Sequence, residues 1–246
     1  RTIAGTMTLR FKPIALPLDQ LVLDAVDLDI QEIKVTGAEL ADRILGPEQL
    51  TLVFAKPIAP NTDTTVQITY KAEPEKGLYF RTPEMGYKPG DTQVWSQGEP
   101  DFHRSWFPCY DYPNERFTSE VICHVPKGME VVSNGRLLGT QEKGELTTWH
   151  WLQDKPHVHY LVALAAGYFH KLEDKAGDLP LALLVPPSHK DQAANGFADT
   201  RKIIEFFQKE TGVAFPWDKY YQVFCHDFLI GGMENTSCTF EASSLL

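Results

Sequence analysis

The sequence has 246 residues, of which 43% are hydrophobic and 23% are charged, and its formal net charge is −10 at pH 7. This composition is that of an ordinary globular chain, and the acidic balance argues against a nucleic-acid partner, which usually requires a basic stripe. No apolar run approaches the roughly 18 residues of a membrane-spanning helix. The four cysteines contain no CxxC pair and form neither a zinc knuckle nor a disulfide scaffold.

The first two-thirds of the chain alternates apolar and polar residues with a period of two. Val66, Ile68 and Tyr70 alternate with polar residues, which places the apolar side chains on one face of a strand. Turn residues separate this run from others. Further strands are predicted at residues 6–11, 26–31, 50–54, 120–125, 130–132, 147–152 and 159–165. The fold class is therefore predicted to be mainly β, with an antiparallel β-sandwich or saddle over residues 1–175.

The pattern changes near residues 175–178, where Lys-Ala-Gly-Asp marks a plausible domain boundary. Residues 179–185 read as a strand, a helical pattern follows, and residues 221–230 read as another strand. A strand, a helix and a strand begin a mixed α/β domain, which we place at residues 176–246.

The helix between these strands has recognisable ends. Ser188-x-x-Asp191 resembles a capping box, and Gly212 is a natural C-terminal stop. The apolar stripe predicted to face the core comprises Phe197, Ile203, Ile204 and Phe207.

The stretch FLIGGMENTSCTF, residues 228–240, raises a chemical question. Two glycines leave the backbone of an edge strand open, so that an extended peptide can add to it through main-chain hydrogen bonds. A carboxylate just beyond that edge, Glu234, could hold the α-ammonium group of such a peptide. A tight turn with a solvated Glu is at least an equal reading of this short motif by itself.

A second stretch, residues 95–111, is dense in aromatics and in charges of both signs. We expect Arg104 to form a structural ion pair with Asp111 or Asp101, and the neighbouring aromatics to pack. Glu99 differs, because it lies beside Gln97 and Gly98, where a ligand could approach closely. The aromatics expected to pack are Trp106 and Phe107.

These two stretches carry a resemblance. WSQGEPDFHRSWFPCYDYPNERFTSEV resembles the segment of aminopeptidase N-like zinc metallopeptidases that pairs Gln-x-Glu with an Arg and Phe-Pro-Cys-x-Asp. GGMEN is similar to that family's exopeptidase motif, in the form found in the leukotriene hydrolase and cold-adapted bacterial branch. The resemblance covers essentially the whole chain and implies a β-rich N-terminal domain followed by the start of a thermolysin-like catalytic domain.

The resemblance also implies a substrate site. Glu234 would bind the α-ammonium of a peptide with a free N-terminus, and Glu99 would be the second amine-binding carboxylate. Gln97 would lie on the same strand edge near the first side-chain pocket. Two converging carboxylates repel each other, and an arriving cation relieves that repulsion. The residues implied to form the site are Gln97, Glu99, Gly231, Gly232, Met233, Glu234 and Asn235.

The sequence also departs from the family pattern. Tyr112 replaces the Glu of the commoner Asp-Glu-Pro, and residues 114–116 replace the commoner Ser-x-Lys run, which puts the branch assignment in doubt more than the chemistry. The family's zinc site, His-Glu-x-x-His on a helix, does not occur in the 246 residues. Since the chain starts at Arg1 and stops at Leu246, we expect a portion of a longer enzyme. Zinc is implied for that parent, and no metal ligand or catalytic residue is assigned here.

The histidines leave one other possibility for a metal. His157 and His159 would share one face of a strand, but such a pair is far more often packing or surface than a zinc site. We therefore predict a piece of a zinc-dependent aminopeptidase that is inactive by itself. The alternative is a non-catalytic interaction or scaffold module of the same family. Neither the cellular compartment nor the oligomeric state follows from the sequence.

Overall fold

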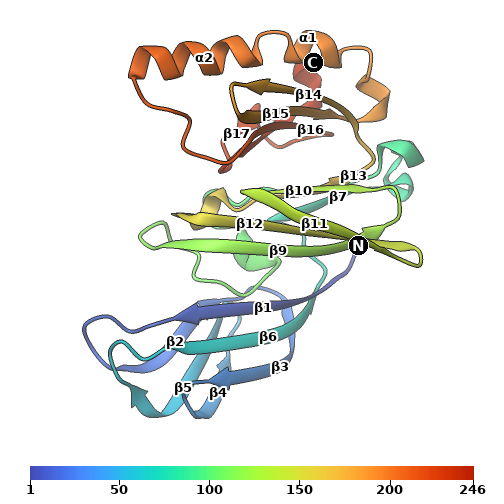
Figure 1. Cartoon of the computed structure of the whole chain (residues 1–246). Coiled ribbons are helices and arrows are strands. Elements are labelled where there is room, and N and C mark those ends of the chain that lie inside the picture. Colours follow the sequence, from blue (N-terminus) through green and yellow to red (C-terminus); the bar gives the residue numbers. More distant parts are fainter. The chain divides into compact units, whose positions relative to one another are not determined.

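The computed structural model describes all 246 residues and divides the chain into two compact units (Figure 1). The first unit contains residues 1–79 and 97–112, and the second contains residues 80–96 and 113–246. The fold is mainly β, as the periodicity predicted.

The first unit is a sandwich of two antiparallel three-stranded sheets, with strand orders β1-β6-β3 and β2-β5-β4. The alternation around Val66 and Ile68 lies on β6, the central strand of its sheet, where both side chains are fully buried. The strands are β1 (Ile3–Phe11), β2 (Leu18–Asp24), β3 (Leu28–Thr36), β4 (Leu40–Leu45), β5 (Gln49–Ile58) and β6 (Thr64–Ala72).

The core of this sandwich draws side chains from both sheets. Leu23, Leu50 and Leu52 from the second sheet are completely buried together with Val66 and Ile68 from the first. Burying each such side chain contributes about 1.5–3 kcal/mol, so these five side chains stabilise the packing of the two sheets on each other.

The second unit contains three sheets, and β7 (Leu78–Arg81) crosses from the first unit into it. Their strand orders are β10-β13-β8-β7, β11-β12-β9 and β14-β15-β16-β18-β17. The strands of the first two sheets are β8 (Gln93–Ser96), β9 (Arg116–Pro126), β10 (Glu130–Ser133), β11 (Arg136–Lys143), β12 (Leu146–Val158) and β13 (Leu164–Gly167). The strands of the third sheet are β14 (His170–Ala176), β15 (Leu179–Val185), β16 (Tyr220–Cys225), β17 (Gly232–Met233) and β18 (Cys238–Ala242).

The third sheet is mixed. Strands β14 and β15 form an antiparallel hairpin, whereas β15, β16 and β18 run parallel. Gly177 makes the hairpin turn with φ +61°, so residues 175–178 connect two paired strands. The division at residue 175 that the composition suggested stays a prediction.

Two helices lie over one face of this sheet (Figure 1), α1 (Ala193–Phe197) and α2 (Thr200–Thr211). Gly212 adopts a left-handed conformation after α2, as predicted. The capping box is wrong, because Ser188 lies in a 3₁₀ turn and its N–H donates to an Asp91 carboxylate oxygen at 3.0 Å.

The predicted helical stripe is only partly correct. Phe197 packs with Leu183 and Phe224 in the core below α1. Ile203 and Phe207 are more than half exposed on α2. The helix therefore keeps an apolar face that neighbouring elements of this chain do not cover.

The predicted strand at residues 221–230 also needs correction. Strand β16 ends at Cys225, and residues 226–231 form turns before β17. Asp227 has φ +47°, a conformation that breaks an extended strand, and Leu229 and Ile230 are exposed. An apolar run thus occurs here without a strand.

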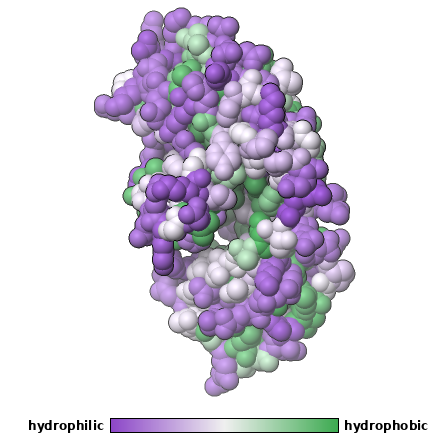
Figure 2. All heavy atoms as spheres, turned by 90° about the vertical axis from the view of Figure 1, so that its right-hand side faces the viewer, coloured by the Kyte–Doolittle hydropathy of each residue, from purple (hydrophilic) through white to green (hydrophobic).

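Hydrophilic residues predominate on the face shown in Figure 2, in keeping with the net charge of −10. None of the helices has both the length and the apolar character to cross a bilayer.

Candidate functional site

The Gly-Gly-Met-Glu-Asn segment contains β17 (Gly232–Met233), the edge strand of the five-stranded sheet. Strand β17 pairs with β18 through Gly232 and Met233, and the Ala242 N–H donates to the Gly231 carbonyl at 3.0 Å. No strand pairs with the other side of β17. The segment therefore has one main-chain edge open, as the glycines indicated.

Neither glycine is required by this fold. Gly231 and Gly232 have no positive φ, a Cβ on Gly231 would have no neighbour within 4 Å, and one on Gly232 would make ordinary contact at 3.4 Å. Both residues are exposed. Packing and turn geometry usually explain a glycine pair, and here they do not.

The side chains that follow alternate in exposure. Met233 is 1% exposed and anchors the strand, Glu234 is exposed, and Asn235 is 4% exposed. The Glu234 carboxylate has no hydrogen bond or ion pair in the structure. Both amide atoms of Asn235 are buried without a hydrogen-bond partner, an arrangement that costs about 1–3 kcal/mol per group. The motif therefore carries unused charge and unused hydrogen-bonding capacity.

A buried polar network holds the turn after Glu234. The Asn134 side chain donates to the Leu161 and Thr236 carbonyls at 2.9 and 2.8 Å, and its Oδ1 accepts from the Ala163 N–H at 2.8 Å. The Thr236 hydroxyl lies 3.1 Å from Nδ1 of His157. These contacts join the motif to β12 and to the loops around β10 and β13.

The Gln97-Gly98-Glu99 segment belongs to the first unit. Its place on a strand edge is wrong, since β8 ends at Ser96, although the Gln97 N–H still donates to the Gly77 carbonyl at 2.9 Å. Gln97 is buried and Glu99 is exposed. A Cβ on Gly98 would lie 2.1 Å from Nε2 of His103, so this glycine serves the packing of that ring.

Arg104 forms the ion pairs that the sequence predicted. Its guanidinium lies 3.1 Å from Asp111 and 3.4 Å from Asp101, and also 3.6 Å from Asp24. Asp24 and Asp111 are each 3% exposed, and burial with these two carboxylates raises the pKa of the Cys109 thiol. Asp24, the partner of Arg104 on β2, was not predicted, because nothing in the sequence links residues 24 and 104. The packing prediction is confirmed for Trp106, which is 9% exposed, and for Phe107, which packs on the sandwich core.

The two predicted halves of the amine site lie in different units. Glu99 and Gln97 belong to the first unit, and the residues from Gly231 to Asn235 belong to the second. The two-carboxylate site therefore stays a prediction.

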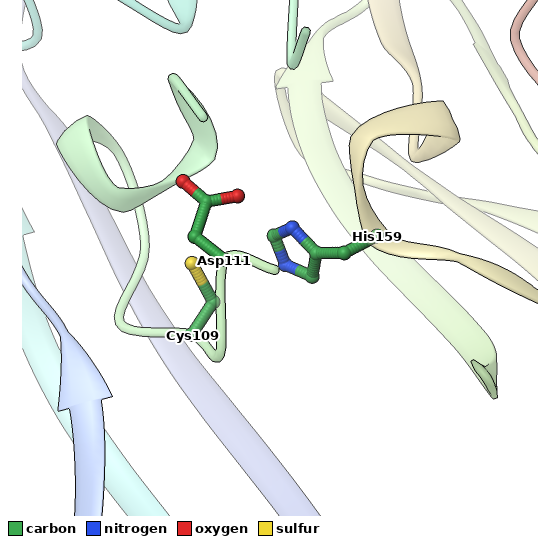
Figure 3. Close-up of side chains that lie close together, drawn as sticks. All are labelled: Cys109, Asp111 and His159. Carbon is green, nitrogen blue, oxygen red and sulfur yellow. The ribbon is translucent and has the colours of Figure 1, made fainter. Parts of the chain in front are cut away.

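Cys109, Asp111 and His159 are residues of types that can bind metals. Figure 3 shows Cys109 and Asp111 on the loop that follows residues 103–105, and His159 on a 3₁₀ turn, His159–Leu161. Cys109 and Asp111 belong to the first unit and His159 to the second. The three residues thus divide between the two units, and no metal ligand is assigned among them.

His157, which the sequence offered with His159 as a possible metal pair, already has partners for its ring. The ring nitrogens of His157 lie 2.9 Å from the Ser119 hydroxyl and 3.1 Å from the Thr236 hydroxyl. Burial, with His159 nearby, lowers the pKa of His157 to about 4. Since both nitrogens already face hydroxyl groups, the His157 ring has no free position for a metal.

Two family models match the chain. The Peptidase M1 N-terminal domain matches residues 1–161, and the Peptidase family M1 domain matches residues 196–246. The first match alone covers well over half of the sequence, and the two matches occur in the order that the resemblance implied.

Individual relatives agree with these matches. Probable aminopeptidase 1 of Sulfurisphaera tokodaii is 23% identical over 231 residues, and Leucyl aminopeptidase of Saccharolobus solfataricus is 25% identical over 232 residues. Each alignment covers 93% of this chain and 28% of the relative. Leukotriene A-4 hydrolase of Xenopus laevis is 26% identical, over the whole of this chain and 41% of its own length.

The chain therefore spans less than a third of the length of the two aminopeptidases. Taken together with the edge strand that carries Gly-Gly-Met-Glu-Asn, the family matches lead to one conclusion: this chain belongs to the M1 peptidase family.

Proposed function

We propose that the complete protein is a zinc-dependent aminopeptidase, which removes N-terminal residues from peptides, and that this chain supplies its recognition of the substrate amine. The observation that carries the proposal is the exposed Glu234 carboxylate, which has no partner and directly follows the open strand β17. The family matches and the relatives named aminopeptidases support the reaction class.

In this proposal each group has a distinct task. The open edge of β17 aligns the peptide main chain by strand addition. Glu234 accepts charge-assisted hydrogen bonds from the α-ammonium group. Glu99 and Gln97 take the roles that the family resemblance implies for them, a second amine-binding carboxylate and a residue near the first side-chain pocket. An internal peptide bond carries no α-ammonium, so the site selects chain ends. Zinc chemistry would require residues that this chain does not contain, and no catalytic step is assigned to it.

The domain division remains part of the proposal. Residues 1–175 would form the β domain and residues 176–246 the beginning of the catalytic domain. The positions of the two family matches, 1–161 and 196–246, support this division.

The proposal is tested with Glu234→Gln in the complete protein. A hydrogen bond to a charged group contributes about 1.5–3 kcal/mol, so kcat/KM for leucyl-p-nitroanilide should fall about 10- to 100-fold. Glu145→Gln is the control, because Glu145 is exposed in a turn and its side chain has no partner. Unchanged KM and kcat in Glu234→Gln would refute the assignment.

A further inference from the structure

Lys219 is a buried cation without a counter-charge. It is 3% exposed, immediately before β16, and its Nζ forms no ion pair with a carboxylate. Its ammonium lies over two rings, 4.8 Å from the centroid of Trp151 and 5.1 Å from that of Tyr221. Burial of a charge is costly unless the charge is well solvated by its surroundings, so an isolated ammonium here calls for an explanation.

The hydrogen bonds of Lys219 identify what it holds. Nζ donates to the Ser133 carbonyl at the end of β10, at 2.7 Å, and to the Ser237 hydroxyl, at 2.9 Å. Ser237 is three residues beyond Glu234, in the turn that joins β17 to β18. The ammonium thus joins the substrate-binding segment to a strand of a different sheet.

The turn itself is strained and depends on such support. Ser237 has φ +66°, a left-handed conformation that is unfavourable for a residue with a Cβ. Its hydroxyl also accepts from the Gly135 N–H at 2.8 Å, and its carbonyl accepts from the Tyr221 N–H at 3.1 Å. With both acceptor positions of the hydroxyl occupied, the side chain is fixed in one orientation.

We propose that Lys219 is a positioning residue for substrate-amine recognition: its buried ammonium locks the turn at residues 235–238 and thereby fixes the direction of the Glu234 carboxylate. This inference rests on the proposed function of Glu234. A neutral donor of the same length is not available among the natural side chains, and an ammonium offers three donors on a flexible stem. The aromatic rings supply part of the solvation that water would otherwise provide.

A double-mutant cycle in the complete protein tests this inference, with Lys219→Met and Glu234→Gln measured singly and together. A small misplacement of a binding group can cost up to about 100-fold, and we expect Lys219→Met to raise KM for leucyl-p-nitroanilide about tenfold with kcat nearly unchanged. If Lys219 acts through Glu234, it should have no further effect on KM in the Glu234→Gln background.

Lys155→Met is the matched control. Lys155 donates two comparable hydrogen bonds, to the Pro216 carbonyl and to Asp218, but it does not contact the turn at residues 235–238. Its KM should equal that of the unmodified protein. Circular dichroism and the unfolding midpoint of each variant show whether the fold is kept.

The outcomes separate the inference from the proposed function. If Glu234→Gln raises KM and Lys219→Met multiplies that effect independently, the positioning role is refuted while the amine anchor stands. If Glu234→Gln changes nothing, the proposed function fails first. If Lys219→Met does not fold, Ser237→Ala removes the same hydrogen bond from the other end and takes its place in the cycle, with the same criterion.

Discussion

Gly135 provides a sharp test of the packing around the turn at residues 235–238. It has φ +73°, and a Cβ at this position would lie 1.9 Å from the Leu152 carbonyl oxygen, which is backbone and cannot swing away. Its N–H donates to the Ser237 hydroxyl at 2.8 Å. Gly135→Ala therefore introduces strain, a steric clash and a weakened hydrogen bond at one site.

The magnitude follows from these three effects. The left-handed conformation costs a residue with a Cβ about 1–2 kcal/mol, overpacking adds about 1–3 kcal/mol, and the hydrogen bond contributes about 1 kcal/mol. Gly135→Ala should lower the free energy of unfolding by about 3–6 kcal/mol. Gly144→Ala is the control, since Gly144 has φ +60° and no atom within 4 Å of the added Cβ, and it should lose only about 1–2 kcal/mol.

Urea denaturation followed by tryptophan fluorescence measures both losses. Trp151, whose indole donates to the Val131 carbonyl at 3.0 Å, reports on this region. Equal destabilisation by the two substitutions would show that the close approach of Gly135 to Leu152 does not exist, and the packing of the turn would need to be reconsidered.

Two further predictions concern buried charge. Arg104→Met removes the guanidinium that pairs with the buried Asp24 and Asp111 carboxylates and should lower the free energy of unfolding by about 3–5 kcal/mol. The control Lys34→Met breaks an exposed ion pair and should change the free energy of unfolding by less than about 1 kcal/mol. Similar losses for the two variants in urea titrations would contradict the buried ion-pair network. The pKa of His157 is lowered from 6.5 to about 4 in the folded chain, so the unfolded chain binds more protons than the folded chain between these pH values. The contribution of His157 to the free energy of unfolding is therefore fully present above pH 6.5 and is lost as the pH falls toward 4. His157→Gln should flatten that part of the pH–stability curve, and an unchanged slope would exclude His157 as its source.

The sequence was sufficient for the mainly β fold class and for strands with a clear period of two. Strands such as β2, β4, β11 and β14 were missed, and residues 159–161, which were predicted as part of a strand, form a 3₁₀ turn. Strand β6 was predictable because Val66 and Ile68 alternate with polar residues, and a period of two on a half-buried strand needs only local information. Gly212 was predictable for the same reason, since a left-handed position after a helix favours glycine wherever the helix lies. The motif at residues 231–235 was recognisable because its residues are consecutive, and its role in binding a substrate amine stays a prediction.

The errors arose where hydrophobicity was used without tertiary information. Leu229 and Ile230 are apolar, but Asp227 breaks the strand before them, so they lie exposed. Phe207 has the correct helical spacing, yet the sheet below α2 does not cover it. Ser188 has the spacing of a cap, but Asp91, almost a hundred residues earlier, binds its N–H.

The sequence by itself determined the strand periodicity, the open glycine pair and the lone Glu234, because each depends on neighbouring residues. Only the tertiary structure identified the contacts that hold the turn after Glu234. Nothing in the sequence links Asn134 or Lys219 to the turn after Glu234. Folding brings the end of β10 and the residue before β16 to that turn. A buried ammonium is recognisable only from its surroundings, because burial is a property of the packed chain and not of the residue.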